Sequence, residues 1–381
     1  MVSKTTRIFT NMTLVAISNK LIIPIKANNK LSCTLEPINM KKIIHIFILL
    51  LLISCHKEKI TPLNITRNIQ PSRKIQIQEK CFSNGTYRDS ILFFIAECCP
   101  EGRYIYMFND SLQEIHRYGE KGRLFNEFNM PFFYKNSKRY KEDSLIQIYD
   151  LNLLHEKQLN CRFINTYHHL VDGKLLPSKL YFAENLNQID SNLVIGNTIE
   201  VNNGIFFIYN NSTDSIRWID CNTRLHFNNP EIKFAAHKNI ICANPSQKVF
   251  YVGYRFLDLI QWYDVNGKLL KNIQFSKLKE PFQAKQYVGI SYDNPLYIID
   301  MYATSEYCYA LRVNIPIEQL NANQSIPCQI LVMDWEGNIK DVIQIPFLIT
   351  PLVINENNTK LFSTCPNNAD PEYAYLVEFD L

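Results

Sequence analysis

Four acidic residues occupy the same place in a short repeated phrase, and they are the side chains in this sequence with the most obvious chemical potential. The phrase is an Ile or Leu, two intervening residues, an apolar or aromatic residue, and then Asp; it ends at Asp220, Asp264, Asp334 and Asp380. Carboxylates at equivalent positions could ligate a metal ion. An Asp at the start of a turn more often accepts backbone hydrogen bonds, and we expect that role here.

Other residue types offer little for catalysis. His168 and His169 are the only adjacent His pair, and neighbouring side chains on a strand point in opposite directions, so a shared metal is not expected. The sequence contains no Gly-rich phosphate loop, no Gly-x-Ser-x-Gly elbow and no His-Glu-x-x-His motif. We therefore predict no catalytic residue, no bound metal and no cofactor.

The repeated phrase indicates strands that run into turns. Two copies continue into hairpin signals, Val265-Asn266-Gly267-Lys268 and Trp335-Glu336-Gly337-Asn338. Trp218 and Trp262 hold the same place in their copies, which predicts packing between repeats. Further apolar, aromatic and β-branched runs read as strands, namely 74–78, 90–96, 104–108, 180–183, 205–209, 249–254 and 296–299. Helical turns are predicted only at 185–191 and 317–321.

Counting the repeats gives an all-β fold, a six-bladed β-propeller. A degenerate first copy ends at Gly119, and Asp150 follows it too closely to begin a new four-stranded unit. We therefore assign Asp150 to an earlier strand of its own blade, equivalent to 106–110, with 154–159 as the next strand. Third strands then end near 119, 159, 220, 264, 334 and 380. The last blade lacks an outer strand, which an N-terminal strand at about 74–80 can supply. A two-domain β-sandwich is the alternative.

The N-terminal region has the pattern of an export signal. Met40-Lys41-Lys42 is a basic start, 43–53 is apolar except for His45, and Ser54-Cys55 follows, resembling the lipobox of bacterial lipoproteins. We expect 40–55 to be a lipoprotein signal peptide with Cys55 as the lipidation site. Residues 1–39 read as an upstream extension, or as a genuine extension with a weak apolar patch at 21–25. Residues 56–73 are predicted to be a flexible tether, and 74–381 the propeller.

Charge and cysteine content limit the possible partners. Removing the seven basic residues and one acidic residue of 1–55 from totals of 40 and 36 leaves 33 basic and 35 acidic residues, a net charge of −2. With no basic stripe, no nucleic-acid partner is expected. Nine Cys remain after residue 55, with no zinc-ligand spacing, and most lie in apolar strand patterns where a free thiol fills the core.

Three stretches resemble the TolB-like six-bladed propeller lipoproteins of Bacteroidetes, a family of uncharacterised function. They are the lipobox at Cys55; the Gly-rich connection 119–123 with Glu127-Phe128 and Pro131; and the closing pattern at 330–343 and 353–362. Leu124-Phe125-Asn126 departs from the Gly and Pro usual in the family. The resemblance implies a propeller in the bacterial cell envelope, at the outer membrane, and it carries no catalytic residues to transfer.

Two functions remain open from the sequence. The preferred one is a lipid-anchored propeller, on the periplasmic face or the cell surface, whose end face binds an envelope protein, peptide or glycan without catalysis. Its membrane contact would be the lipid anchor on Cys55. The alternative is a metal-dependent propeller hydrolase or lactonase with a central-channel site held by inward Glu, Asp and Asn side chains. The enzyme question stays open, with a non-enzymatic role preferred.

Overall fold

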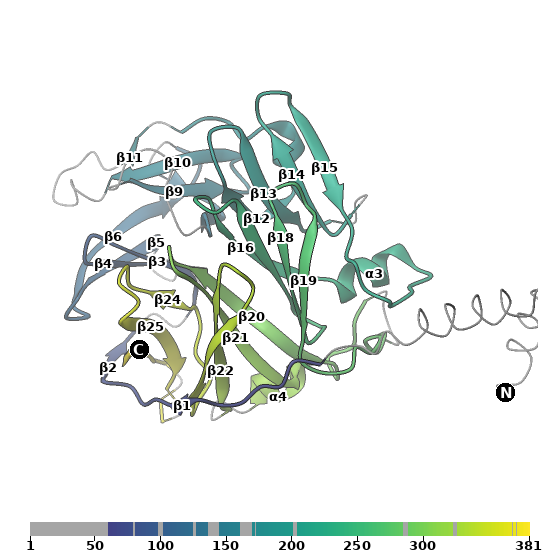
Figure 1. Ribbon diagram of the computed structural model, residues 1–381. Helices are drawn as coiled ribbons and strands as arrows, with labels where there is room; N and C mark the ends of the chain where they lie inside the picture. Colours follow the sequence, from purple (N-terminus) through teal and green to yellow (C-terminus); the bar gives the residue numbers. More distant parts are fainter. Residues whose placement is uncertain are drawn as a thin grey trace, which may run out of the picture. The chain divides into compact units, whose positions relative to one another are not determined.

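The chain folds into six small sheets arranged in a ring (Figure 1). The computed structural model describes residues 60–78, 81–97, 102–124, 127–135, 145–160, 170–171, 173–200, 204–284, 289–322, 326–367, 369–370 and 372–381. Each sheet has four or five strands that follow one another outward from the ring axis, and we count them as first, second, third and fourth from the axis. The predicted six-bladed β-propeller is confirmed, and the β-sandwich alternative is wrong.

The first three blades follow the chain in order. Blade 1 comprises β3 Phe82–Arg88, β4 Ile91–Ala96, β5 Arg103–Asn109, β6 Glu114–Lys121 and, parallel to β6, β7 Glu127–Phe128. Blade 2 comprises β8 Pro131–Phe133, β9 Leu145–Asp150, β10 His155–Asn160 and β11 Leu170–Val171. Blade 3 comprises β12 Ala183–Gln188, β13 Leu193–Thr198, β14 Phe206–Asn210 and β15 Ser215–Ile219.

Of the last three blades, blades 5 and 6 include strands from both ends of the chain. Blade 4 comprises β16 Asn239–Asn244, β17 Val249–Tyr254, β18 Leu259–Asp264 and β19 Leu269–Gln274. Blade 5 comprises β20 Pro295–Ala303, β21 Tyr307–Pro316, β22 Cys328–Asp334, β23 Ile339–Ile345 and, parallel to β23, β1 Arg67–Asn68. Blade 6 comprises β24 Val353–Ile354, β25 Lys360–Pro366, β26 Ala374–Asp380 and β2 Arg73–Ile77.

The hydrophobic core is divided among the six junctions between blades. Six clusters of buried residues each draw on two neighbouring blades. Within β4, for example, Phe93 and Ile95 belong to the cluster shared with blade 2, and Leu92 and Phe94 to the cluster shared with blade 6. Alternate residues of a strand face opposite sides of its sheet, so each blade is apolar on both faces and needs two neighbours.

The repeated phrase does not fall on the same strand in every blade. The copies ending at Asp264, Asp334 and Asp380 lie on the third strand, as does 154–159, as predicted. The copies ending at Gly119 and Asp220 lie on or directly after the fourth strand, and Asp150 ends the second strand rather than an equivalent of 106–110. The pattern selects strands that enter turns, and more than one strand per blade meets that condition.

The two predicted hairpins are confirmed. The Asp264 Oδ1 atom accepts hydrogen bonds from the backbone N–H groups of Asn266 (2.9 Å) and Lys268 (2.9 Å), and Gly267 has a φ of 71°. Asp334 repeats this arrangement, with Gly337 at a φ of 86°. Only glycine adopts these left-handed conformations without steric cost, which explains the Asp-x-x-Gly signal.

Within the described residues, three short helices interrupt the strand pattern. They are η2 Ser178–Leu180, α3 Pro230–Ala236 and α4 Ile317–Ala322. The helical turn predicted at 317–321 is confirmed by α4. The one predicted at 185–191 is wrong because most of that segment pairs as β12, and part of the strand predicted at 180–183 is η2. Asn229 caps α3 through hydrogen bonds from Glu231 and Ile232, a signal that the sequence contains.

The N-terminal segment closes the ring. β2 pairs antiparallel with the last strand, from Arg73 opposite Glu378 to Ile77 opposite Ala374, so the predicted closing strand at about 74–80 is confirmed with slightly earlier bounds. Before it, Ile60 pairs with Gln274 of blade 4, and β1 pairs with blade 5 (Figure 1). Residues 60–72 of the predicted tether thus lie along the outer strands of two blades, and we call 60–77 the strap.

Candidate functional site

The ring axis is crossed by an ion pair between opposite blades. Lys135 follows the innermost strand of blade 2, and Asp300 lies on the innermost strand of blade 5, three blades away. The Lys135 Nζ atom donates to Asp300 Oδ1 and also lies 3.4 Å from the Met301 carbonyl oxygen. The two side chains are only 14% and 5% exposed, so this pair joins the two halves of the ring at its centre.

The carboxylate of Asp300 already has several donors. Besides Lys135, it accepts hydrogen bonds from the backbone N–H of Met301 (2.8 Å) and, at Oδ2, from the backbone N–H of Leu352 in blade 6 (2.8 Å). A buried carboxylate satisfied by a cation and two amides is a structural group first. In this arrangement Asp300 links three blades and has little capacity left for a ligand.

Buried polar atoms without a hydrogen-bond partner lie on two other innermost strands. They are Ser83 Oγ and Asn84 Oδ1 on β3, and Asn187 Oδ1 on β12. The Asn187 amide nitrogen donates to the Ile241 carbonyl of the next blade, so that side chain is fixed. Such oxygens can accept hydrogen bonds from an ordered water or a small ligand.

No metal-binding cluster is formed by the described part of the chain. Across those residues, no three His, Cys, Asp or Glu side chains come together as a group that could hold an ion. The repeated Asp residues lie apart: Asp264 and Asp334 close hairpin turns, Asp220 lies 2.5 Å from Lys233, and Asp380 is the last residue of β26. His168 and His169 lie outside the described residues.

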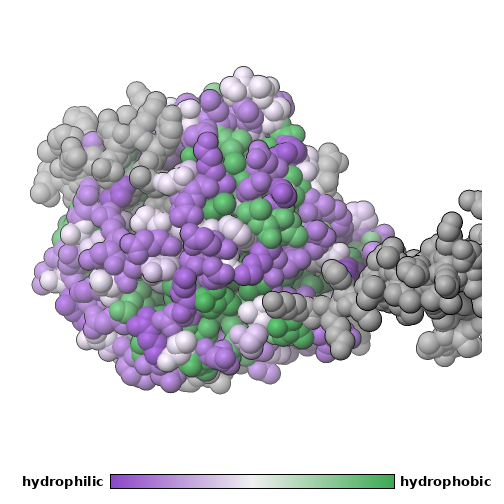
Figure 2. Space-filling view, in the orientation of Figure 1, coloured by the Kyte–Doolittle hydropathy of each residue, from purple (hydrophilic) through white to green (hydrophobic). Residues whose placement is uncertain are grey.

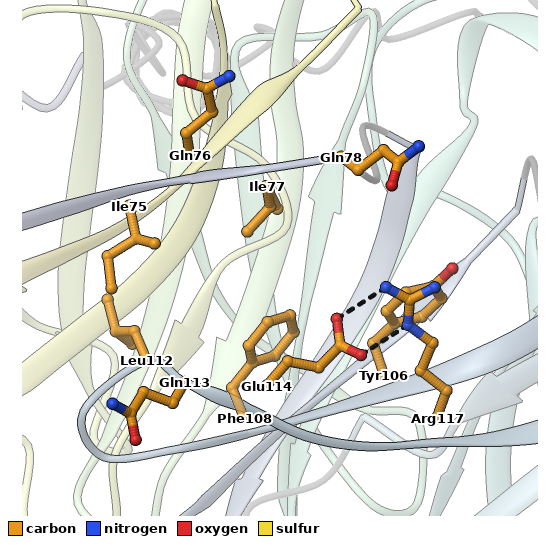
Figure 3. A pocket seen from close by; sticks show the side chains of 10 residues that line it. All are labelled: Ile75, Gln76, Ile77, Gln78, Tyr106, Phe108, Leu112, Gln113, Glu114 and Arg117. Carbon is orange, nitrogen blue, oxygen red and sulfur yellow. Dashed lines mark hydrogen bonds and ion pairs between the residues drawn. The ribbon is translucent and has the colours of Figure 1, made fainter.

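A pocket opens at the seam between the last and first blades (Figure 3). It has a volume of about 410 Å³ and lies between β2 and the outer strands β5 and β6. Its apolar lining comes from Ile75, Ile77, Phe108 and Leu112, and its polar lining includes Gln78 and Gln113. We call this cavity the seam pocket. One of its walls is the closing strand itself, so the pocket exists only once the ring is closed.

Glu114 and Arg117 place charge in the seam pocket. The Arg117 Nε atom lies 2.6 Å from Glu114 Oε1, and Nη2 lies 3.0 Å from Oε2, a paired contact seen in Figure 3. The guanidinium carbon also lies 4.8 Å from the ring centroid of Tyr106. The pair remains about one-third exposed, so its outer edges can still meet a solute.

The remaining predicted residues have structural positions or lie outside the description. Cys55, the predicted lipidation site, is among the residues that the structure does not describe, so that prediction stays a prediction. Trp262 packs between blades 4 and 5, near Tyr251 and Gly337, as expected. Trp218 is on a fourth strand and contacts Phe207 of its own blade, so the two Trp residues are not equivalent.

Five of the described cysteines follow the core-filling prediction. Cys242, Cys308, Cys328 and Cys365 are free and buried, and burial raises the pKa of the Cys308 thiol. Cys221 is free and half-buried, and burial raises its pKa to about 12. Cys81, in contrast, is disulfide-bonded. A raised pKa lowers the thiolate fraction, and with it the reactivity, of the Cys221 and Cys308 thiols.

These features define a six-bladed β-propeller whose centre is closed by an ion pair and whose described pocket lies at the ring seam. A member of the DUF4221 family from Bacteroides vulgatus has the same fold, with a TM-score of 0.54 and 13% identity over 82% of this chain and 97% of that one. A putative exported protein from Bacteroides fragilis aligns with a TM-score of 0.50 and 11% identity over 79% of this chain and 91% of that one. Searches of family models and of curated proteins give no match.

Sequence reasoning missed both the seam pocket and the axial ion pair. Glu114 directly precedes the degenerate copy of the phrase that ends at Gly119, and Arg117 lies within it, without a motif of their own. Lys135 and Asp300 are 165 residues apart, and their pairing depends on two blades being opposite. No local pattern signals a contact of that kind. In the described residues from 60 onward, no helix is both long and apolar enough to span a bilayer.

Proposed function

We propose that the protein is exported, anchored to a bacterial membrane by a lipid on Cys55, and acts as a binding or scaffold module for a protein, peptide or glycan of the envelope, without catalysis. The anchor would place it in the outer membrane, as in the TolB-like lipoproteins that its sequence resembles. The observation that carries the binding role is the seam pocket, where an apolar floor meets a Glu–Arg pair.

Three observations support export. The basic start at Met40-Lys41-Lys42, the apolar run and Ser54-Cys55 fall in the order of a lipoprotein signal. Cys81 is disulfide-bonded, and disulfides persist mainly in oxidising compartments outside the cytosol. One protein of the same fold is described as a putative exported protein.

The lining of the seam pocket favours a ligand with both apolar and hydrogen-bonding groups. Ile75, Ile77 and Phe108 offer an apolar surface, while Gln78, Gln113, Glu114 and Arg117 offer donors and acceptors at the opening. Peptides and glycans both present this combination. Pockets of this size that combine an apolar floor with a few polar groups are typical of ligand sites.

Ligand binding can be tested by thermal unfolding. The purified protein is heated with a panel of envelope glycans and with a panel of peptides, and a ligand that binds the folded state raises the unfolding temperature. We expect a member of one panel to raise the unfolding temperature. This shift should be lost in the Arg117→Ala variant and retained in a Lys268→Ala variant, whose site is in blade 4, away from the pocket. Shifts that are equal in all three proteins would contradict the seam pocket as the site.

Metal content separates this proposal from a propeller hydrolase. The purified protein is expected to carry no stoichiometric divalent ion, because the carboxylate at the axis is already bonded to Lys135 and two amides. One tightly bound divalent ion per chain, together with ester or lactone hydrolysis lost on chelation, would replace the binding role by the enzymatic one.

The anchor is tested by cell fractionation. The protein should label with a radioactive fatty acid and sediment with membranes, and the Cys55→Ala variant should lose the label and appear in the soluble fraction. An unlabelled wild-type protein would contradict the lipid anchor while leaving the seam pocket untouched.

A further inference from the structure

The strap enters the propeller at one particular place. Thr61 donates its backbone N–H to the Gln274 carbonyl oxygen (2.7 Å), and Ile60 pairs with the same residue, the last of blade 4. Ile60 is five residues after Cys55 in the sequence. Five extended residues reach at most about 17 Å, so a lipid on Cys55 would hold this edge of blade 4 close to the bilayer.

The connection that begins beside this point exposes two aromatic side chains. It runs from the end of blade 4 to blade 5 and carries Phe282, 69% exposed, and Tyr292, 63% exposed. Ile60 itself is 49% exposed. Large apolar side chains exposed together usually mark a contact surface.

Hydrogen bonds at Phe282 join the two described arms of this connection, 275–284 and 289–294, so the exposure is built into the fold. The buried Asn294 side chain accepts a hydrogen bond from the Phe282 N–H (2.7 Å) and donates one to the Phe282 carbonyl (2.7 Å). The Ser291 N–H also donates to the Phe282 carbonyl (2.8 Å), which brings the two arms of the connection together. The apolar side chains thus project from a braced loop.

Basic residues accompany the aromatic ones. Lys277 and Lys279 are exposed in the same connection, between the strap entry and Phe282. Glu280 is also exposed there, so the segment from Lys277 to Phe282 keeps a net positive charge. Lys beside exposed aromatic side chains is the composition of surfaces that bind anionic lipid headgroups.

We propose that Ile60, Lys277, Lys279, Phe282 and Tyr292, here called the entry patch, rest on the anionic membrane surface and dock the propeller there in a fixed orientation. This inference depends on the proposed lipidation of Cys55, which supplies the anchor. The rings insert at the headgroup level and the two ammonium groups pair with lipid phosphates. Docking would leave the seam pocket, on another part of the ring wall, open to its ligand.

The entry patch lies at the end of the ring where the chain passes from one blade to the next, and this end has further exposed apolar residues. At this end, the connections between blades and the loops between second and third strands expose Leu175, Phe182 and Ile199. Ile199 donates its N–H to the Phe182 carbonyl (3.0 Å), which places these two side by side. In contrast, the described turns between first and second strands, at the other end, expose no large apolar side chain. In Figure 2, apolar residues likewise form separate patches in a mainly hydrophilic surface.

Lipid contact can be tested directly by fluorescence quenching. The lipidated protein is reconstituted into vesicles of phosphatidylethanolamine and phosphatidylglycerol that contain brominated acyl chains, which quench a nearby Trp. We compare the Phe282→Trp variant with an Ile115→Trp variant, whose site is also exposed but lies on β6 of blade 1. The three native Trp residues are subtracted with the unsubstituted protein.

We expect quenching of the added Trp in Phe282→Trp and none in Ile115→Trp, and a decrease of that quenching when both Lys277 and Lys279 are changed to Gln. If the emission of the added Trp in Phe282→Trp is the same in brominated and in ordinary vesicles, as in Ile115→Trp, docking is overturned, even though the protein is anchored. Failure of lipidation is recognised separately, because the protein would then lack fatty-acid label and would not reconstitute at all.

Discussion

At the scale of single residues, Asp334 shows that a repeated Asp can stabilise a turn instead of forming part of a functional site. Its Oδ1 atom accepts hydrogen bonds from the backbone N–H groups of Glu336 (3.1 Å) and Asn338 (2.7 Å), and Oδ2 lies 2.9 Å from the Lys340 Nζ atom. Burial alone raises the pKa of this carboxyl, but the bonds from Asn338 and Lys340 outweigh it and lower the pKa to about 2. These bonds require the ionised form.

Asp334 therefore gives the protein an acid-sensitive contribution to stability. Because its pKa is lower in the folded state, the contribution is complete above the usual carboxyl pKa of about 4 and is lost as the pH falls toward 2. Urea unfolding of wild type and Asp334→Asn should differ by about 2 kcal/mol at pH 7 and converge near pH 2. The Lys340→Met variant should show a smaller difference. A constant difference from pH 7 to pH 2 would contradict this role.

At the scale of elements, neighbouring blades are joined by polar clamps as well as by apolar clusters. Between blades 4 and 5, the Arg312 Nε and Nη2 atoms each lie 2.9 Å from an oxygen of Asp258, and Nη1 lies 2.9 Å from Gln329 Oε1. The two charged side chains are only 9% and 2% exposed. Such a buried pair fixes how the two blades meet more than it adds to net stability. Removing one partner is nevertheless costly, because it leaves a buried charge without compensation.

The Arg312→Met variant should therefore be strongly destabilised, by about 3–5 kcal/mol in urea unfolding, because Asp258 would be buried without its partner. The matched control is Arg67→Met, which breaks the exposed pair with Asp341 at 2.7 Å. That loss should be within about 1 kcal/mol, since surface pairs contribute little. Equal losses in the two variants would show that the clamp between blades is not specifically buried in solution.

At the scale of the whole molecule, the strap determines whether the ring is closed. β2 supplies the outer strand of blade 6, and Ile75 and Ile77 pack into the cluster between blades 6 and 1. Upstream, the Thr66 N–H donates to the Val342 carbonyl (3.0 Å) and the Ile69 N–H to the Gln344 carbonyl (3.1 Å). Without the strap, β26 would become an exposed edge and the last junction would lose part of its core.

Truncations should separate the parts of this closure. A protein lacking residues 1–59 keeps the whole strap and should unfold cooperatively like the full chain. A protein lacking 1–77 loses β2 and should be largely unfolded or aggregated, as measured by circular dichroism and size-exclusion chromatography. A protein lacking 1–72 keeps β2 and should fold with lower stability. A cooperative, monomeric 78–381 fragment would contradict closure by the strap.

Sequence patterns alone determined the fold class, the number of blades and the closing strand. Each of these follows from local chemistry: alternating apolar residues give strands, Asp-x-x-Gly gives the hairpins at Gly267 and Gly337, and a final repeat that ends at the C-terminus leaves one strand to be supplied from elsewhere. The assignment of individual strands was less secure, as Gly119 and Asp220 show, because fourth strands enter turns with the same residues.

Only the tertiary structure decided which residues meet. Lys135 and Asp300 pair because two of six blades are opposite, and the seam pocket exists because β2 lies against the first blade. The exposed position of Phe282 beside the strap entry is also set by ring geometry. Periodicity reports the conformation of each segment, whereas contacts across the ring depend on how the segments are placed in space, and that information is spread over the whole chain.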